Sequence, residues 1–96
     1  MRNGYGKSLF PTEDGKCYVC GFVGDTARHE ILHGANRSIS KRFGLWIAVC
    51  PRCHANIHAE DNGSYLYLKE EAEERFLREY NKDVADFIAI FGRNYL

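Results

Sequence analysis

The sequence predicts a small α+β domain, in which a metal-stapled core of two strands and one helix precedes C-terminal helices. Three observations support this class. The 96 residues are 45% hydrophobic and 14% aromatic, which suits one packed core and excludes a disordered chain or a large multidomain enzyme. Four cysteines form two Cys-x-x-Cys pairs, and the apolar residues change from a continuous run in the middle of the chain to helical spacing near its end.

We expect a single domain over residues 1–96, with its metal-bound core at 17–60 and an amphipathic helical segment at 66–91. No run of about 18 apolar residues occurs, and residues 1–6 lack the apolar stretch of a secretory signal. We therefore predict a cytoplasmic protein without a membrane span. The 13 basic and 13 acidic residues balance, but residues 1–58 carry a net charge of +4 and residues 59–96 one of −4. The first part is predicted to present a basic face.

The opening of the chain is predicted to be irregular. Residues 1–16 are rich in glycine and polar side chains, and turn-forming residues such as Pro11 interrupt any regular pattern. We expect this lead-in segment to pack on the domain through Tyr5, Leu9 and Phe10.

The cysteines follow as two identical pairs, Cys17 with Cys20 and Cys50 with Cys53. Cytosolic thiols stay reduced, which argues against two disulfides. A redox dithiol needs one pair within a βαβ pattern, and the sequence has no such pattern. Two Cys-x-x-Cys pairs are the ligand set of one tetrahedral zinc ion. We therefore predict a structural zinc (Zn²⁺) held by all four thiolates, on which the folding of this small chain depends.

A hairpin is predicted between the two cysteine pairs. Residues 26–33 have β-forming character and predict a strand that ends at Gly34. Residues 36–43 are polar and basic, which suits a loop or a short helix stopped by Gly44. The continuous apolar run 45–49 predicts a buried strand, and the two strands are expected to pair.

A short helix is predicted next, over residues 51–59. Pro51 suits the first position of a helix, where its missing N–H has no partner to lose. His54 and His58 are four residues apart, so both imidazoles lie on one face of this helix. Turn residues at 61–64 are expected to follow it.

The C-terminal part is predicted to be helical and to supply much of the core. Apolar residues recur there at intervals of three or four, which is the pattern of an amphipathic helix. The stripe comprises Leu66, Ala72, Phe76, Tyr80, Val84, Phe87, Ile88 and Phe91. Residues 81–83 are expected to divide it into two helices, with Asp83 as the N-cap of the second. The aromatic residues of this stripe are interpreted as core.

Four histidines remain, His29 and His33 on the first strand and His54 and His58 on the helix. The zinc joins the start of that strand to the helix, so all four are expected near one cleft. Such a group can hold a second divalent metal with open coordination positions. Ordinary hydrogen-bonded imidazoles are the alternative for the two strand histidines.

At this point the sequence resembles the HNH endonuclease superfamily, which has the ββα-metal fold with a treble-clef-like zinc core. The resemblance is closest to small phage-associated members, is specific over residues 17–58 and is weaker elsewhere. Its residues are Cys17-x2-Cys20, His29-Glu30, Gly34-Ala35-Asn36-Arg37 and Cys50-Pro51-x-Cys53-His54-x3-His58.

The resemblance implies metal-dependent hydrolysis of DNA phosphodiester bonds. His54 and His58 match the metal-ligand positions for a catalytic Mg²⁺ or Mn²⁺, while the four cysteines hold a separate structural zinc. Two assignments of His29 and Glu30 stay open. Either His29 is the general base and Glu30 helps to bind the metal, which we prefer by a small margin, or His29 is a ligand and Glu30 is the base.

DNA is the expected partner. Arg37, Lys41 and Arg42 lie beside the predicted cleft, where they would neutralise phosphates. A homodimer would suit cleavage of both strands. A second hypothesis is an inactive zinc-binding module for nucleic acid or protein on the same fold, because Asn36 precedes the position near Gly44 where the family usually has its asparagine.

Overall fold

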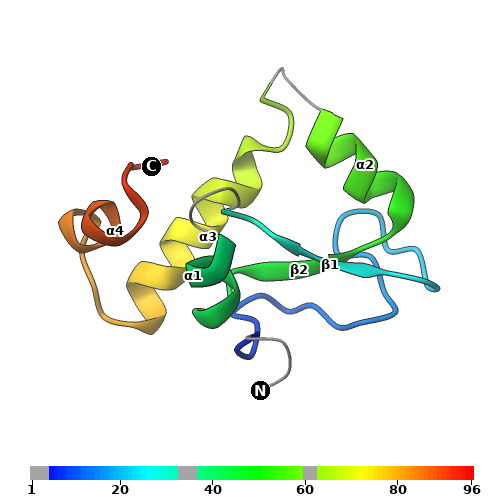
Figure 1. The fold of residues 1–96 in the computed structure, drawn as a ribbon, viewed down its shortest axis with the longest axis horizontal. Helices are drawn as coiled ribbons and strands as arrows, with labels where there is room; N and C mark the ends of the chain where they lie inside the picture. Colours follow the sequence, from blue (N-terminus) through cyan, green and yellow to red (C-terminus); the bar gives the residue numbers. More distant parts are fainter. Residues whose placement is uncertain (1–4, 33–36, 60–62) are drawn as a thin grey trace.

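The computed structural model describes residues 5–32, 37–59 and 63–96, and its architecture is small α+β (Figure 1). The elements in chain order are β1 (Ala27–Glu30), α1 (Arg37–Arg42), β2 (Trp46–Val49), α2 (Pro51–Ala59), α3 (Leu66–Glu79) and α4 (Val84–Phe91). The two-stranded sheet lies at the centre of the molecule, with α2 beside it, the long α3 along another side and α4 farthest from α2 (Figure 1).

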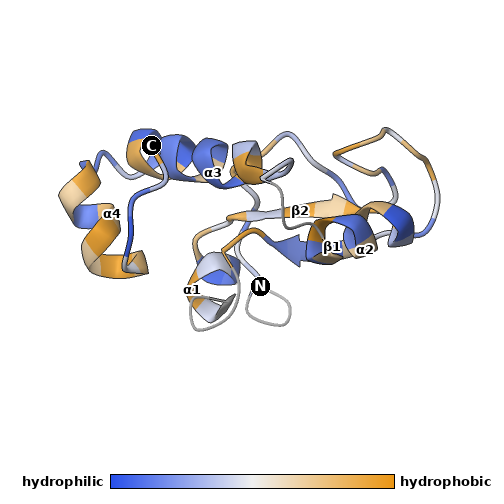
Figure 2. Cartoon of the chain, turned by 90° about the horizontal axis from the view of Figure 1, so that it is seen from above, coloured by the Kyte–Doolittle hydropathy of each residue, from blue (hydrophilic) through white to orange (hydrophobic). Residues whose placement is uncertain are grey.

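The predicted hairpin is confirmed. β1 and β2 pair antiparallel, with His29 opposite Ile47 and Glu30 opposite Trp46. All four residues of β2 are buried, as its apolar run requires, whereas much of β1 is hydrophilic (Figure 2). β1 thus carries polar side chains and pairs with the fully buried β2.

The first strand is shorter than the predicted 26–33 segment. It ends at Glu30, and the chain then bends so that Ile31 and Leu32 both enter the core, with 1% and 2% of their surfaces exposed. The bend and the burial of these two side chains thus occur together, directly after the strand. His33 and Asn36 lie outside the described residues.

Of the two alternatives for the hairpin connection, the structure has the short helix α1. Gly44 follows it with φ of +78°, and a Cβ atom at this position would lie 2.1 Å from the carbonyl oxygen of Lys7. Leu9 N–H donates to the Gly44 carbonyl at 2.8 Å. The glycine therefore lets the lead-in segment pack directly on the turn.

The C-terminal helices form as predicted, with the break between them at residues 80–83. Asp83 is the N-cap of α4 and forms a capping box with Asp86, which confirms its predicted role. Phe76, Phe87 and Phe91 are buried and their rings contact one another.

One aromatic residue of the stripe departs from its predicted place in the core. Tyr80 is 36% exposed because it is the C-cap residue of α3, where the chain leaves the helix. Its ring still packs on Phe43 and Phe76, and its hydroxyl donates to the Phe43 carbonyl at 3.1 Å. Tyr80 therefore covers the rim of the core.

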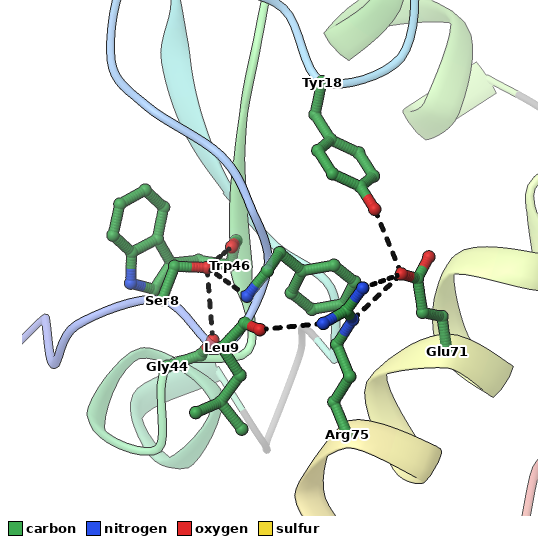
Figure 3. A network of polar contacts seen from close by, with 8 residues as sticks. Ser8, Leu9, Tyr18, Gly44, Trp46, Glu71 and Arg75 are labelled. Atoms are coloured by element: carbon green, nitrogen blue, oxygen red, sulfur yellow. Dashed lines mark hydrogen bonds and ion pairs between the residues drawn. The ribbon is translucent and has the colours of Figure 1, made fainter.

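A polar network joins α3 to the rest of the molecule (Figure 3). Arg75 pairs with Glu71 at 2.7 Å and donates to the Leu9 carbonyl at 3.1 Å. The hydroxyl of Tyr18, between the first two cysteines, donates to the same Glu71 carboxylate at 3.0 Å. This network and the buried Phe10 attach the lead-in segment and the first cysteine pair to α3.

No helix in the described part of the chain is long and apolar enough to cross a membrane.

Candidate functional site

The structure brings the four predicted zinc ligands together. The ligand atoms of Cys17, Cys20, Cys50 and Cys53 all lie within 4.8 Å of one another. Cys17 and Cys20 come from a turn closed by the Gly21 N–H bond to the Cys17 carbonyl at 2.9 Å. Cys50 and Cys53 come from the end of β2 and the first turn of α2. The hairpin and the lead-in segment thus meet at this cluster.

The spacing of the sulfur atoms fits a tetrahedral metal site. The Sγ atoms of Cys20 and Cys50 are 3.8 Å apart, and all four cysteines are free of disulfides. In a tetrahedral site with Zn–S bonds of about 2.3 Å, two thiolates are separated by about 3.8 Å. The cluster is therefore suited to a structural metal such as zinc.

The electrostatics of the cysteine cluster also call for a cation. Burial favours the neutral thiol of Cys17, but hydrogen bonds from Cys20, Cys50 and Val19 outweigh it and lower its pKa to about 6. Burial, together with hydrogen bonds and charge from the other cysteines, raises the pKa of Cys53 to about 12. A divalent ion removes this conflict by stabilising all the thiolates together.

Arg52 adds positive charge at the outer edge of this cluster. A hydrogen bond with Cys20, and then the charges of Cys20, Cys53 and Cys50, raise the pKa of Arg52 above its usual value. A zinc ion with four thiolates carries a net charge of −2, which this guanidinium partly offsets.

A second cluster lies on the neighbouring turn of the same helix. The ligand atoms of His29, His54 and His58 all lie within 4.8 Å of one another, and the Nε2 atoms of His54 and His58 are 3.0 Å apart. His29 comes from β1 and is 4% exposed, whereas His54 is half-buried and His58 is exposed. These residues lie together because β1 packs against α2 in the fold.

The geometry of the three histidines and the pKa of His54 fit a divalent ion. Two imidazole nitrogens bound at about 2.1 Å to one metal are separated by about 3.0–3.4 Å, depending on the coordination angle. The pKa of His54 is lowered, first by burial and then by the charge of His58, while the charge of Glu30 acts in the opposite direction. Neutral imidazole is the form that binds metal. Exposure increases from His29 to His58, so the outer side of the cluster is open to solvent.

Glu30 is the residue after His29 in β1 and does not belong to this second cluster. It is 6% exposed and close enough to His54 for its charge to affect that imidazole, but its carboxylate oxygens are not among the clustered ligand atoms. The hydroxyl of Tyr5 donates a hydrogen bond to Glu30 Oε2. The lead-in segment therefore binds the carboxylate of the residue that follows His29.

The three cations predicted to contact DNA all belong to α1. Arg37 is the first residue of the helix, and Lys41 and Arg42 form its last turn. The ammonium group of Lys41 lies 4.7 Å from the centre of the Tyr5 ring, which places it near Glu30. The Arg42 guanidinium lies over Phe43 instead.

Sequence reasoning missed Tyr5 and Arg28 as neighbours of the site. The guanidinium of Arg28 lies 4.2 Å from the Trp46 ring centre and pairs with Asp14 at 2.7 Å. Tyr5 lies 25 positions before Glu30, in a segment with no regular pattern. No local motif marks either contact.

A pocket of about 260 Å³ opens beside His29 and His58. Tyr65 and Lys69, near the start of α3, line its other side. The pocket lies between the histidine cluster and the start of α3.

No protein-family model matches the chain, and no curated protein or solved structure is significantly similar to it.

Proposed function

We propose that this chain is a metal-dependent DNA endonuclease of the HNH type, with the ββα-metal fold. The observation that carries the proposal is the convergence of His29, His54 and His58 from β1 and α2, beside a buried carboxylate. The order of strand, strand and helix, and the separate cluster of four cysteines, agree with the sequence resemblance to this superfamily.

Each cluster has its own task in this proposal. The four cysteines would hold a structural zinc that joins the hairpin to the turn of Cys17 and Cys20. The three histidines would hold a catalytic Mg²⁺ or Mn²⁺, and oxygen atoms of water and substrate, which these ions prefer, would fill the remaining positions. When bound, a divalent ion supplies charge stabilisation at the scissile phosphate and at the departing oxygen.

Glu30 is the general base in this proposal. His29 lies with the other two imidazoles, so in this proposal its nitrogen is a metal ligand and His29 is not the base. Glu30 accepts a proton from water, the water oxygen forms a bond to phosphorus, and the bond to the leaving ester oxygen breaks. That oxygen takes a proton from solvent. The burial of Glu30 and the effect of its charge on His54 support this assignment.

DNA is the proposed partner, and the phosphate backbone is the proposed point of contact. Lys41 and Arg42 form the basic last turn of α1, and Arg37 begins the same helix. Lysine and arginine contacts to phosphate give binding that weakens steeply as salt is raised. A homodimer remains part of the proposal only as a way to cut both strands.

The test is the conversion of supercoiled plasmid by zinc-loaded protein with Mg²⁺, Mn²⁺ or no added ion. Wild type is expected to nick only with the added ion, and His54→Ala to nick at least about 100-fold more slowly with its zinc content unchanged. Asn56→Ala is the matched control, because Asn56 is exposed on another face of α2. Equal nicking by His54→Ala and Asn56→Ala would contradict the proposal.

One observation favours a second function, an inactive zinc-binding module for nucleic acid or protein. At 3.0 Å, the Nε2 atoms of His54 and His58 can satisfy each other by a hydrogen bond that needs no metal. This function predicts no nicking by a folded, zinc-loaded protein, and a DNA affinity that added Mg²⁺ or Mn²⁺ leaves unchanged.

A further inference from the structure

We infer that Tyr5 is a positioning residue for the Glu30 carboxylate. This inference rests on the proposed function, in which Glu30 accepts the proton of the attacking water. Tyr5 belongs to the lead-in segment, outside the cysteine and histidine motifs, and its hydroxyl donates to Glu30 Oε2. Holding one carboxylate oxygen stops rotation of the group, so the second oxygen keeps one place relative to the histidines.

Tyr5 and the next residue, Gly6, are held by contacts with β2 and α1. The Tyr5 ring meets Trp46 edge-on, with 5.6 Å between ring centres and an angle of 74°. The indole N–H of Trp46 donates to the Gly6 carbonyl at 2.8 Å, and Gly6 N–H donates to the Lys41 carbonyl at 2.9 Å. A Cβ atom at Gly6 would lie 2.5 Å from the Arg42 carbonyl oxygen, so only glycine permits this close approach.

Two cations lie against the same ring. The Arg28 guanidinium is 4.9 Å and the Lys41 ammonium 4.7 Å from the Tyr5 ring centre. Arg28 is itself held by two hydrogen bonds to Asp14, at 3.1 and 2.7 Å. Positive charge beside a phenol makes its O–H a stronger donor, which strengthens the bond to the carboxylate. The cluster around Tyr5 therefore favours an oriented Glu30.

The experiment measures kcat and KM for plasmid nicking by Tyr5→Phe, which removes one hydroxyl and keeps the ring. We expect kcat to fall by about tenfold or more, the range for losing a hydrogen bond to a charged group, with KM within about twofold of wild type. Tyr80→Phe is the matched control, because it also removes a tyrosine hydroxyl bond but at the rim of the core. Its kcat is expected to match wild type.

A double-mutant cycle separates positioning from a structural role. If Tyr5 acts through Glu30, adding Tyr5→Phe to Glu30→Gln causes no further loss of kcat, because the residue that it positions is already removed. Equal losses in both backgrounds would overturn the inference. So would a Tyr5→Phe protein that loses its zinc or its native circular dichroism, since the hydroxyl would then serve the fold.

The outcomes distinguish this inference from the proposed function. Nicking by wild type together with unchanged kcat in Tyr5→Phe overturns the role of Tyr5 alone. Absence of metal-dependent nicking by the wild type overturns the endonuclease proposal, and the inference with it.

Discussion

Cys53 and His54 are neighbours in α2, yet they belong to two different groups of metal-ligating side chains. Cys53 is buried and lies with three other thiols, of which Cys20 is exposed, and four thiolates would fill all positions of a tetrahedral ion. His54 is half-buried with only two other imidazoles, which leaves positions open. Two adjacent residues of one helix thus belong to a cluster of four thiols and to a more open cluster of three imidazoles.

Glu73 is a second buried acidic residue outside both groups. It is 0% exposed, and its Oε1 accepts a hydrogen bond from the Tyr95 N–H at 2.6 Å. Its Oε2 is buried with no hydrogen-bond partner among the described residues. A buried carboxylate that is half satisfied is expensive for the fold.

We predict opposite effects for two substitutions of Glu73. Glu73→Gln keeps an oxygen for the Tyr95 N–H and removes the charge, so the free energy of unfolding should stay the same or rise. Glu73→Ala leaves that N–H without its acceptor and opens a cavity, which should lower it by about 1–3 kcal/mol. Urea unfolding with zinc present measures both. A glutamine variant less stable than the alanine variant would contradict this explanation.

The elements whose limits are set by local chemistry could be predicted from the sequence. α2 has the predicted limits because Pro51 starts it, and α4 starts where Asp83 caps it. β1 could not be predicted to end at Glu30, because the bend depends on the burial of Ile31 and Leu32 by the rest of the chain. Local pattern carries no information about that burial.

The capping box of α4 gives a prediction at this scale. Asp83 accepts the Asp86 N–H at 2.9 Å, and the Asp86 side chain accepts the Asp83 N–H at 3.1 Å. Asp83→Ala should lower the free energy of unfolding by about 1 kcal/mol, whereas Asp83→Ser should keep most of it. α4 is far from α2, so nicking should not change (Figure 1). Equal thermal stability of Asp83→Ala and Asp83→Ser would contradict the role of the cap.

At the scale of the whole molecule, the candidate site is assembled from segments far apart in the sequence. The histidine motif and the cysteine pairs could be predicted because short spacings carry them. The contact of Tyr5 with Glu30 could not be predicted, since it joins an irregular segment to a strand 25 positions later. The same holds for the network of Tyr18, Glu71 and Arg75, which attaches α3 to the first cysteine turn.

Zinc is expected to hold these segments together. Without zinc, the segments that meet at the cysteine cluster should separate, because the charges of the remaining thiolates repel one another. We predict that a chelator abolishes the native far-UV and near-UV circular dichroism, and that Cys53→Ser does the same without a chelator. Native spectra from a zinc-free chain would contradict the structural role of the cysteine cluster.

The most direct measurement is a calorimetric titration of Mn²⁺ into protein that already carries its structural zinc. The account predicts one further ion per chain in the wild type and in Asn56→Ala, and none in His54→Ala, since one of the three converging imidazoles is then missing. Absence of Mn²⁺ binding in the wild type, or equal binding in His54→Ala, would contradict the claim that the histidine cluster is an open metal site.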